Sequence, residues 1–196
     1  VSGGSLGNLM ALVTARNIAG MENDPKAVFF ASEDCHVSFL KAVRIMGLNQ
    51  DSLQTIPTDK KGELNMTYLA SIFRKITSEG RKCFAVVGTA GTTVRGAIDP
   101  LTELSKFCKN ENIWFHVDGA IGGIFGLSTN TSELIKGASF ANSITVNPQK
   151  LLGIPKTSSL LLVSNKNNLS SVFSTGLPYA EPLVGSDSHG GELGIQ

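Results

Sequence analysis

Short apolar runs rich in branched residues alternate along this chain with segments of helical period, and no other feature constrains the fold as much. The runs expected to be strands lie at 28–31, 83–87, 113–117, 143–146 and 159–163. A first helix is expected over residues 5–18, where the helical spacing is carried by Leu6, Leu9, Met10 and Val13. Such alternation is typical of a mostly parallel sheet covered on both faces. The sequence therefore predicts a three-layer α/β/α fold.

Three more helices are expected from local patterns. One presents His36, Phe39, Leu40 and Val43 on one face, and another presents Leu69, Ile72, Phe73 and Ile76. The third starts at Asp99-Pro100, because an acidic N-cap followed by proline at the first helical position favours helix initiation. No internal repeat or linker interrupts residues 1–196, which we interpret as one domain. From Pro178 onward the apolar pattern fades, so about 175–196 is expected to be a loop.

The composition excludes several classes of function. Apolar residues make up 41% and charged residues 17%, which suits a globular domain with a sizeable core. The net charge is +1 and no basic run stands out, so we expect no nucleic-acid partner. No apolar stretch reaches the roughly 18 residues of a membrane span, and no leader pattern is present. Cys35, Cys83 and Cys108 lack metal-ligand spacing and are expected to be free thiols in a reducing cytoplasm.

Both ends of the chain look unlike those of a whole protein. The sequence opens without Met on Val1-Ser2-Gly3-Gly4, inside an expected strand-to-helix turn. It stops at Leu193-Gly194-Ile195-Gln196 without a closing element. We therefore expect a fragment of a longer protein.

Polar residues gather where the predicted strands end. His36 follows the run at 28–31, Thr89 follows 83–87, Asp118 ends 113–117 and Lys150 follows 143–146. The Ser2-Gly3-Gly4-Ser5 turn opens the first helix at the same rim. Ligands of open α/β sheets bind beyond the carboxyl ends of the strands. The joint placement predicts a ligand site there.

Each of these residues also has an ordinary structural interpretation. Gly3-Gly4-Ser5 can be a tight turn with Ser5 as N-cap, or a place where an anion meets free helix N–H groups. Asp118 alone can be a turn residue, although the small residues 119–123 after it suit a flat ligand. A lone His36 is usually a satisfied histidine, and a lone Lys150 is usually solvated surface. His116 is interpreted as structural, and His189 is given no role.

In order along the chain, five segments resemble the group II pyridoxal-phosphate (PLP) decarboxylases, which act on glutamate, aspartate, cysteine sulfinate and aromatic amino acids. The segments are Ser2-Gly3-Gly4-Ser5-Leu6-Gly7-Asn8-Leu9, Cys35-His36-Val37-Ser38, Thr89-Ala90-Gly91-Thr92-Thr93 with 96–100 behind it, His116-Val117-Asp118-Gly119-Ala120 and Asn147-Pro148-Gln149-Lys150. The resemblance covers nearly the whole chain. It implies the PLP-binding large domain of the PLP-dependent transferase fold (aspartate aminotransferase-like, fold type I). It also implies that an N-terminal segment and a small C-terminal domain are missing here.

Two positions depart from the family pattern. Gln149 stands where the family usually has histidine before the lysine, and Gly119 stands where it usually has alanine. A glutamine amide can still donate a hydrogen bond to a phosphate oxygen, but it carries no charge and relays no proton.

The resemblance implies a role for each site residue. Lys150 would hold PLP as a Schiff base, Asp118 would pair with the pyridine nitrogen, and His36 would stack on the ring. The other cofactor-binding residues would be Thr89 and Ala120 against the ring, and Gly4, Ser5, Asn147 and Gln149 at the phosphate. No metal is expected. Residues 175–190 would correspond to a loop near the active site, where Tyr179 is a candidate proton donor.

The resemblance further implies α-decarboxylation of an acidic amino acid in a cytoplasmic homodimer, with aspartate slightly favoured over glutamate. We expect residues 1–196 alone to be inactive. Arg95 is the nearest candidate partner for a substrate carboxylate, but the missing segments or a second subunit are the more plausible source of that cation. The alternatives are an aminotransferase or carbon–carbon lyase of the same fold, or a non-catalytic homologue.

Overall fold

The structure is a computed structural model that describes residues 1–174 of the chain. These residues form a six-stranded sheet in the order β2–β1–β3–β4–β5–β6. Neighbouring strands run parallel, except that β5 and β6 pair antiparallel. Parallel neighbours need crossover connections, which the intervening helices supply. The mostly parallel α/β prediction is therefore confirmed.

The elements alternate as the sequence predicts, but β2, α5 and α6 were not predicted. The strands are β1 (Ala27–Ser32), β2 (Leu53–Ile56), β3 (Lys82–Thr89), β4 (Trp114–Gly119), β5 (Ser143–Val146) and β6 (Leu160–Val163). The α-helices are α1 (Gly4–Ile18), α2 (Ser38–Ile45), α3 (Met66–Ser78), α4 (Leu101–Glu111), α5 (Pro148–Leu151) and α6 (Asn167–Phe173). Short 3-10 segments are η1 (Gln50–Ser52), η2 (Gly122–Leu127) and η3 (Ser132–Phe140).

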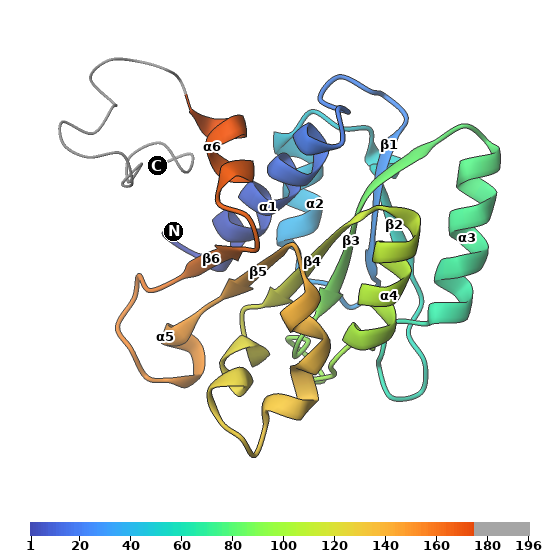
Figure 1. Cartoon of the computed structure of the whole chain (residues 1–196). Helices are drawn as coiled ribbons and strands as arrows, with labels where there is room; N and C mark the ends of the chain where they lie inside the picture. Colours follow the sequence, from blue (N-terminus) through green and yellow to red (C-terminus); the bar gives the residue numbers. More distant parts are fainter. Residues whose placement is uncertain (175–196) are drawn as a thin grey trace.

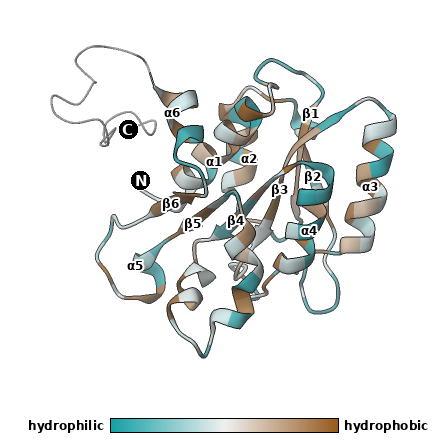
Figure 2. Ribbon diagram, viewed as in Figure 1, coloured by the Kyte–Doolittle hydropathy of each residue, from teal (hydrophilic) through white to brown (hydrophobic). Residues whose placement is uncertain are grey.

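Helices cover both faces of the sheet (Figure 1). Residues of α1 and α2 pack with the sheet around Phe29 and Phe84 in one core cluster. Residues of α3, α4 and η3 pack on the other face around Phe30 and Phe115. The central strands are mostly apolar (Figure 2), as expected of a sheet buried on both sides, with His116 and Asp118 as polar residues within β4.

Three local expectations were wrong. His36 precedes α2 and does not belong to its face, and Leu40 on that helix is 53% exposed. Asp99 does not cap α4: the helix begins at Leu101 with Pro100 as its N-cap residue and no side-chain cap. The Asp99 carboxylate instead accepts hydrogen bonds from the backbone N–H groups of Leu64 (2.8 Å) and Thr89 (2.7 Å). These two buried hydrogen bonds fix the end of β3.

Gly137 marks the tightest packing of η3 on α4. A Cβ atom built there would lie 2.3 Å from the backbone of Leu101 and Thr102, whereas one at Gly126 would meet Ile135 at an ordinary 3.5 Å. Gly137→Ala is expected to lower the free energy of unfolding by about 1–3 kcal/mol, since the backbone must move apart. Gly126→Ala is the matched control and is expected to change it by less than about 1 kcal/mol. Urea denaturation of both variants measures the difference, and equal stabilities would contradict the prediction.

Within residues 1–174, no helix combines the length and apolarity needed to cross a membrane. The same residues contain no cluster of three or more His, Cys, Asp or Glu side chains arranged to hold a metal ion. Cys108 is buried, Cys35 and Cys83 are half-buried, and all three are free thiols.

Candidate active site

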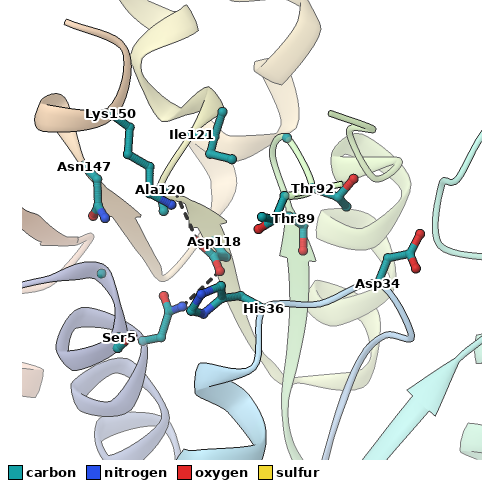
Figure 3. A pocket seen from close by; sticks show the side chains of 14 residues that line it. Ser5, Asp34, His36, Thr89, Thr92, Asp118, Ala120, Ile121, Asn147 and Lys150 are labelled. Atoms are coloured by element: carbon teal, nitrogen blue, oxygen red, sulfur yellow. Dashed lines mark hydrogen bonds between the residues drawn. The ribbon is translucent and has the colours of Figure 1, made fainter. Parts of the chain in front are cut away.

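A pocket of about 130 Å³ lies at the carboxyl-terminal edge of the parallel strands (Figure 3). It is lined by residues of α1, of the segment after β1, of the ends of β3 and β4 and the segments that follow them, and of the β5–α5 turn and α5. Its lining residues are Gly4, Ser5, Asn8, Asp34, His36, Thr89, Gly91, Thr92, Thr93, Asp118, Ala120, Ile121, Asn147 and Lys150. The strand-end residues singled out in the sequence therefore do meet at one site.

The amino terminus of α1 forms one wall of the pocket. Gly3 is the N-cap residue, and no side chain caps the helix. A Cβ atom at Gly4 would lie 2.7 Å from the Asn147 side-chain nitrogen, so only glycine allows this close approach between α1 and the β5–α5 turn. Free N–H groups and the positive end of the helix dipole make such a terminus a favourable site for an anion.

Asp118 supplies a buried carboxylate at the centre of the site. It lies near the end of β4, is 4% exposed and pairs in register with Thr89 of β3. Its Oδ2 accepts a hydrogen bond from Asn8 Nδ2 (2.9 Å), and its Oδ1 accepts one from the backbone N–H of Ala120 (3.2 Å). Both donors stabilise an ionised carboxylate and fix its plane.

His36 is held beside Asp118 by the first residues of α2. Its Nδ1 accepts the backbone N–H of Ser38 (3.1 Å) and lies 2.9 Å from the Ser38 hydroxyl. The neutral ring therefore carries its proton on Nε2. The close-up shows His36, Asp118 and Ser5 around one side of the site (Figure 3).

Three buried side-chain atoms of the pocket-lining residues have no hydrogen-bond partner within the described part of the chain. Asp34 Oδ2 is ion-paired with Arg95, which leaves Thr89 Oγ1 and Asn147 Oδ1 unpaired. Buried polar groups are normally paired, so unpaired ones lining a pocket indicate a polar ligand. The backbone N–H of Thr89 is already engaged by Asp99, whose pKa is raised to about 6 by burial. The hydroxyl is thus the free group at the end of β3.

Lys150 closes the pocket from the β5–α5 side. It lies on α5, directly after Asn147-Pro148-Gln149. Its side chain extends toward Ala120 at the pocket (Figure 3). A primary amine, a buried carboxylate and an imidazole therefore share one small site.

The pocket contains every predicted site residue except one. Gln149 does not line it, and its Nε2 donates instead to Ser159 Oγ (3.1 Å). Tyr179 and His189 lie outside the described residues. Arg95 is paired through its Nε with Asp34 Oδ2 (3.2 Å) at the edge of the site.

Sequence reasoning missed six lining residues: Asn8, Asp34, Gly91, Thr92, Thr93 and Ile121. One of them had a readable signal. Asn8 stands four positions after Gly4, so helical spacing places it on the same face of α1, one turn deeper. A polar residue on the face of α1 that packs on the sheet needs a buried partner.

This arrangement defines an α/β domain with a polar pocket at the strand edge, beside a helix N-terminus that favours an anion, and known proteins share the fold. Residues 2–187 match the family described as the pyridoxal-dependent decarboxylase conserved domain. An aromatic-L-amino-acid decarboxylase from Bacillus atrophaeus is 34% identical over 200 residues, which cover all of this chain and 42% of that protein. Mouse cysteine sulfinic acid decarboxylase is 35% identical over 174 residues, or 85% of this chain and 35% of the mouse enzyme.

Solved structures agree with the sequence matches. The crystal structure of mouse cysteine sulfinic acid decarboxylase in its apo form superposes with a TM-score of 0.84 at 33% identity. The superposition covers 88% of this chain and 38% of the mouse chain. The chain belongs to the pyridoxal-dependent decarboxylase family, whose cofactor is PLP. It spans well under half the length of these relatives.

The residues present fit this cofactor. PLP carries a phosphate, a pyridine nitrogen, a phenolic oxygen and an aldehyde, and the pocket offers a matching group for each. The uncapped start of α1 and the Asn147 side-chain nitrogen, which lies against Gly4, are the donors available to a phosphate. The Asp118 carboxylate, the free Thr89 hydroxyl and the Lys150 amine supply the remaining groups.

Proposed function

We propose that the full-length protein is a PLP-dependent α-decarboxylase of an acidic amino acid, aspartate or glutamate, that releases carbon dioxide. The observation that carries this proposal is the convergence of Lys150, Asp118 and His36 on one pocket beside the amino terminus of α1. Membership of the decarboxylase family supports it.

In this proposal each residue has a defined task. Lys150 attaches the cofactor through its amine, and Asp118 holds a proton on the pyridine nitrogen. The backbone N–H groups of Gly4 and Ser5 bind the phosphate, together with Asn147. PLP, when bound, supplies the electron sink for the electron pair left at the α-carbon as carbon dioxide departs.

His36, Thr89 and Ala120 orient the ring in the same proposal. The His36 imidazole is fixed at Nδ1 by Ser38, so its Nε2–H is free to donate toward the substrate carboxylate. Thr89 offers its hydroxyl to a polar ring substituent. Gln149 assists at the phosphate only if its amide leaves Ser159, to which it donates in this structure.

We propose an acidic substrate because two segments resemble enzymes that act on one. Segment 89–100 resembles the corresponding segment of glutamate decarboxylases, and segment 144–150 resembles that of bacterial aspartate or glutamate decarboxylases. A buried substrate carboxylate needs a cationic partner, because an unpaired buried charge is very costly. Arg95 is already paired with Asp34. We therefore propose that the cation comes from another segment of the full-length chain or from a second subunit of a homodimer.

We also propose that residues 1–196 are the cofactor-binding large domain of a cytoplasmic enzyme, and that they are inactive alone. The relatives named above are two to three times as long as the matched region, which supports a site completed elsewhere. Decarboxylation by residues 1–196 in isolation would contradict this.

Product analysis of the full-length enzyme tests the reaction and the substrate. The panel is aspartate, glutamate, cysteine sulfinate and an aromatic amino acid, compared by kcat/KM with detection of amine and carbon dioxide. We expect the highest value for aspartate, giving β-alanine, with glutamate next. A clear preference for the aromatic substrate would overturn the acidic assignment, and a keto-acid product without carbon dioxide would indicate an aminotransferase.

A further inference from the structure

A chain of buried hydrogen bonds lies behind the pocket, beneath Asp118 and His36. It runs from Trp114 through Ser143, His116 and Asn8 to Asp118, and it branches at Asn8 through Ser38 to His36. Asn8, Ser38, His116 and Ser143 are each no more than 3% exposed. Asn8, Asp118 and His36 line the pocket, whereas Ser38, His116, Ser143 and Trp114 are not among its lining residues.

The direction of the hydrogen bonds is fixed on the side of β4 and β5. Asn8 Oδ1 can only accept, so His116 Nε2 (3.1 Å) must be the donor. Burial lowers the pKa of His116 to about 4, although the Asp118 carboxylate opposes the shift, so the ring carries one proton. His116 Nδ1 is then bare and accepts the Ser143 hydroxyl (2.8 Å), while Ser143 Oγ accepts Trp114 Nε1–H (2.9 Å).

The remaining hydrogen bonds follow from the amide of Asn8. Its Nδ2 has two protons, one donated to Asp118 Oδ2 (2.9 Å) and one to Ser38 Oγ (3.1 Å). The Ser38 hydroxyl then donates its own proton to His36 Nδ1. A reversed Asn8 amide would place oxygen against the carboxylate and leave His116 without an acceptor, so a single arrangement satisfies every group.

We propose that Asn8 is a positioning residue that sets the plane and charge of Asp118 and, through Ser38, the ring orientation of His36. His116 supports it by holding the Asn8 amide in the orientation that donates to Asp118. This inference rests on the proposed function, because Asp118 and His36 act there on the cofactor. In this proposal His116 does more than pack in the core, because its Nε2–H holds the Asn8 amide in place.

Asn8→Asp is the sharpest test of this role, because it keeps the shape and removes the donor. The new carboxylate at position 8 would lie where Asn8 Nδ2 now stands, 2.9 Å from Asp118 Oδ2. Two carboxylates this close share one proton, so Asp118 no longer carries a full negative charge. In the PLP-loaded full-length enzyme we expect kcat to fall roughly 10- to 100-fold with KM little changed. The acid limb of the kcat–pH profile should move up by about one pH unit or more. The other titratable groups facing Asp118 are His36, His116, Cys35, Asp34 and Lys150.

Control variants separate positioning from simple destabilisation. Thr14 is also a fully buried polar residue of α1, but its hydroxyl donates within the helix to the carbonyl of Met10 (2.8 Å). Thr14→Val should therefore leave kcat and the acid limb unchanged. His116→Gln keeps a donor for Asn8 and should stay within a few-fold of wild type, whereas His116→Phe should lose about tenfold in kcat. An acid limb that stays in place in Asn8→Asp, or equal losses in the two His116 variants, would overturn the inference.

A second measurement needs no turnover and no cofactor. In the full-length apo protein with ¹⁵N-labelled histidine, His116 should appear in NMR spectra as the neutral Nε2–H tautomer between about pH 5 and 8. In Asn8→Asp the added carboxylate at Nε2 should raise its pKa, so the ring titrates at higher pH. A charged ring or an Nδ1–H tautomer in the wild type would refute the hydrogen-bond chain even in an active decarboxylase. An inactive enzyme with the expected His116 signals would instead count against the proposed function alone.

Discussion

Lys150→Ala is expected to reduce decarboxylation by the full-length enzyme by roughly three orders of magnitude or more, the largest effect of any single change in this chain. Lys150 is the lysine that lines the pocket, and its amine enters from the side opposite His36 (Figure 3). Without it the cofactor would be held by noncovalent contacts alone. Steady-state turnover with saturating PLP measures the loss.

Two further measurements make the Lys150 assignment specific. Borohydride reduction of the loaded enzyme, followed by peptide mapping, should find the pyridoxyl group on Lys150. Lys75→Ala, which removes an exposed lysine of α3 outside the pocket lining, should leave turnover unchanged. Labelling of any other lysine would contradict the assignment of Lys150 as the residue that binds the cofactor covalently.

Asp118→Asn is expected to lower kcat by roughly two to three orders of magnitude while weakening PLP binding far less. Asparagine keeps the shape of the side chain but removes the charge that stabilises a protonated pyridine nitrogen. It also leaves Asn8 Nδ2 facing a neutral partner in place of a carboxylate. The comparison is between kcat and the PLP dissociation constant in the same variant.

Glu111→Gln serves as the charge control for Asp118→Asn, because Glu111 is an exposed acid at the end of α4. It should change neither constant. If Asp118→Asn retained kcat within a few-fold of wild type, the carboxylate would have a steric rather than an electronic role.

Local periodicity was enough to predict the layers and most of the elements. The strand runs mark buried strands, and the stripe of Leu6, Leu9, Met10 and Val13 marks a helix, although only Met10 of these four residues is buried. The resemblance then singled out Gly4, Asp118 and Lys150, which the structure brings together. These predictions succeeded because each depended on a short segment or on the shared edge of a parallel sheet.

What the sequence missed depends on partners far away along the chain. β2 has only four residues, Leu53–Ile56, with a mixed pattern that becomes a strand by pairing with β1. Asp99 was predicted to cap α4, because an acidic residue before proline favours a helix start. Its carboxylate instead accepts hydrogen bonds from the backbone N–H groups of Leu64 and Thr89. Helical spacing from Gly4 places Asn8 on the site-facing side of α1, but it does not identify the partner, Asp118, 110 positions away. Tertiary contacts decided all three.

The hydrogen bond between Asn8 and Asp118 also bears on how the chain acquires its cofactor. Contacts between such distant segments form late in folding, because loop closure costs entropy before those contacts can stabilise anything. During synthesis the pocket is incomplete until Asn147 and Lys150 have been made and β5 has paired with β4. PLP would then bind only the finished domain and would stabilise it by mass action, without assisting any earlier intermediate. A shortage of PLP would therefore shorten the lifetime of the folded protein without changing its rate of folding.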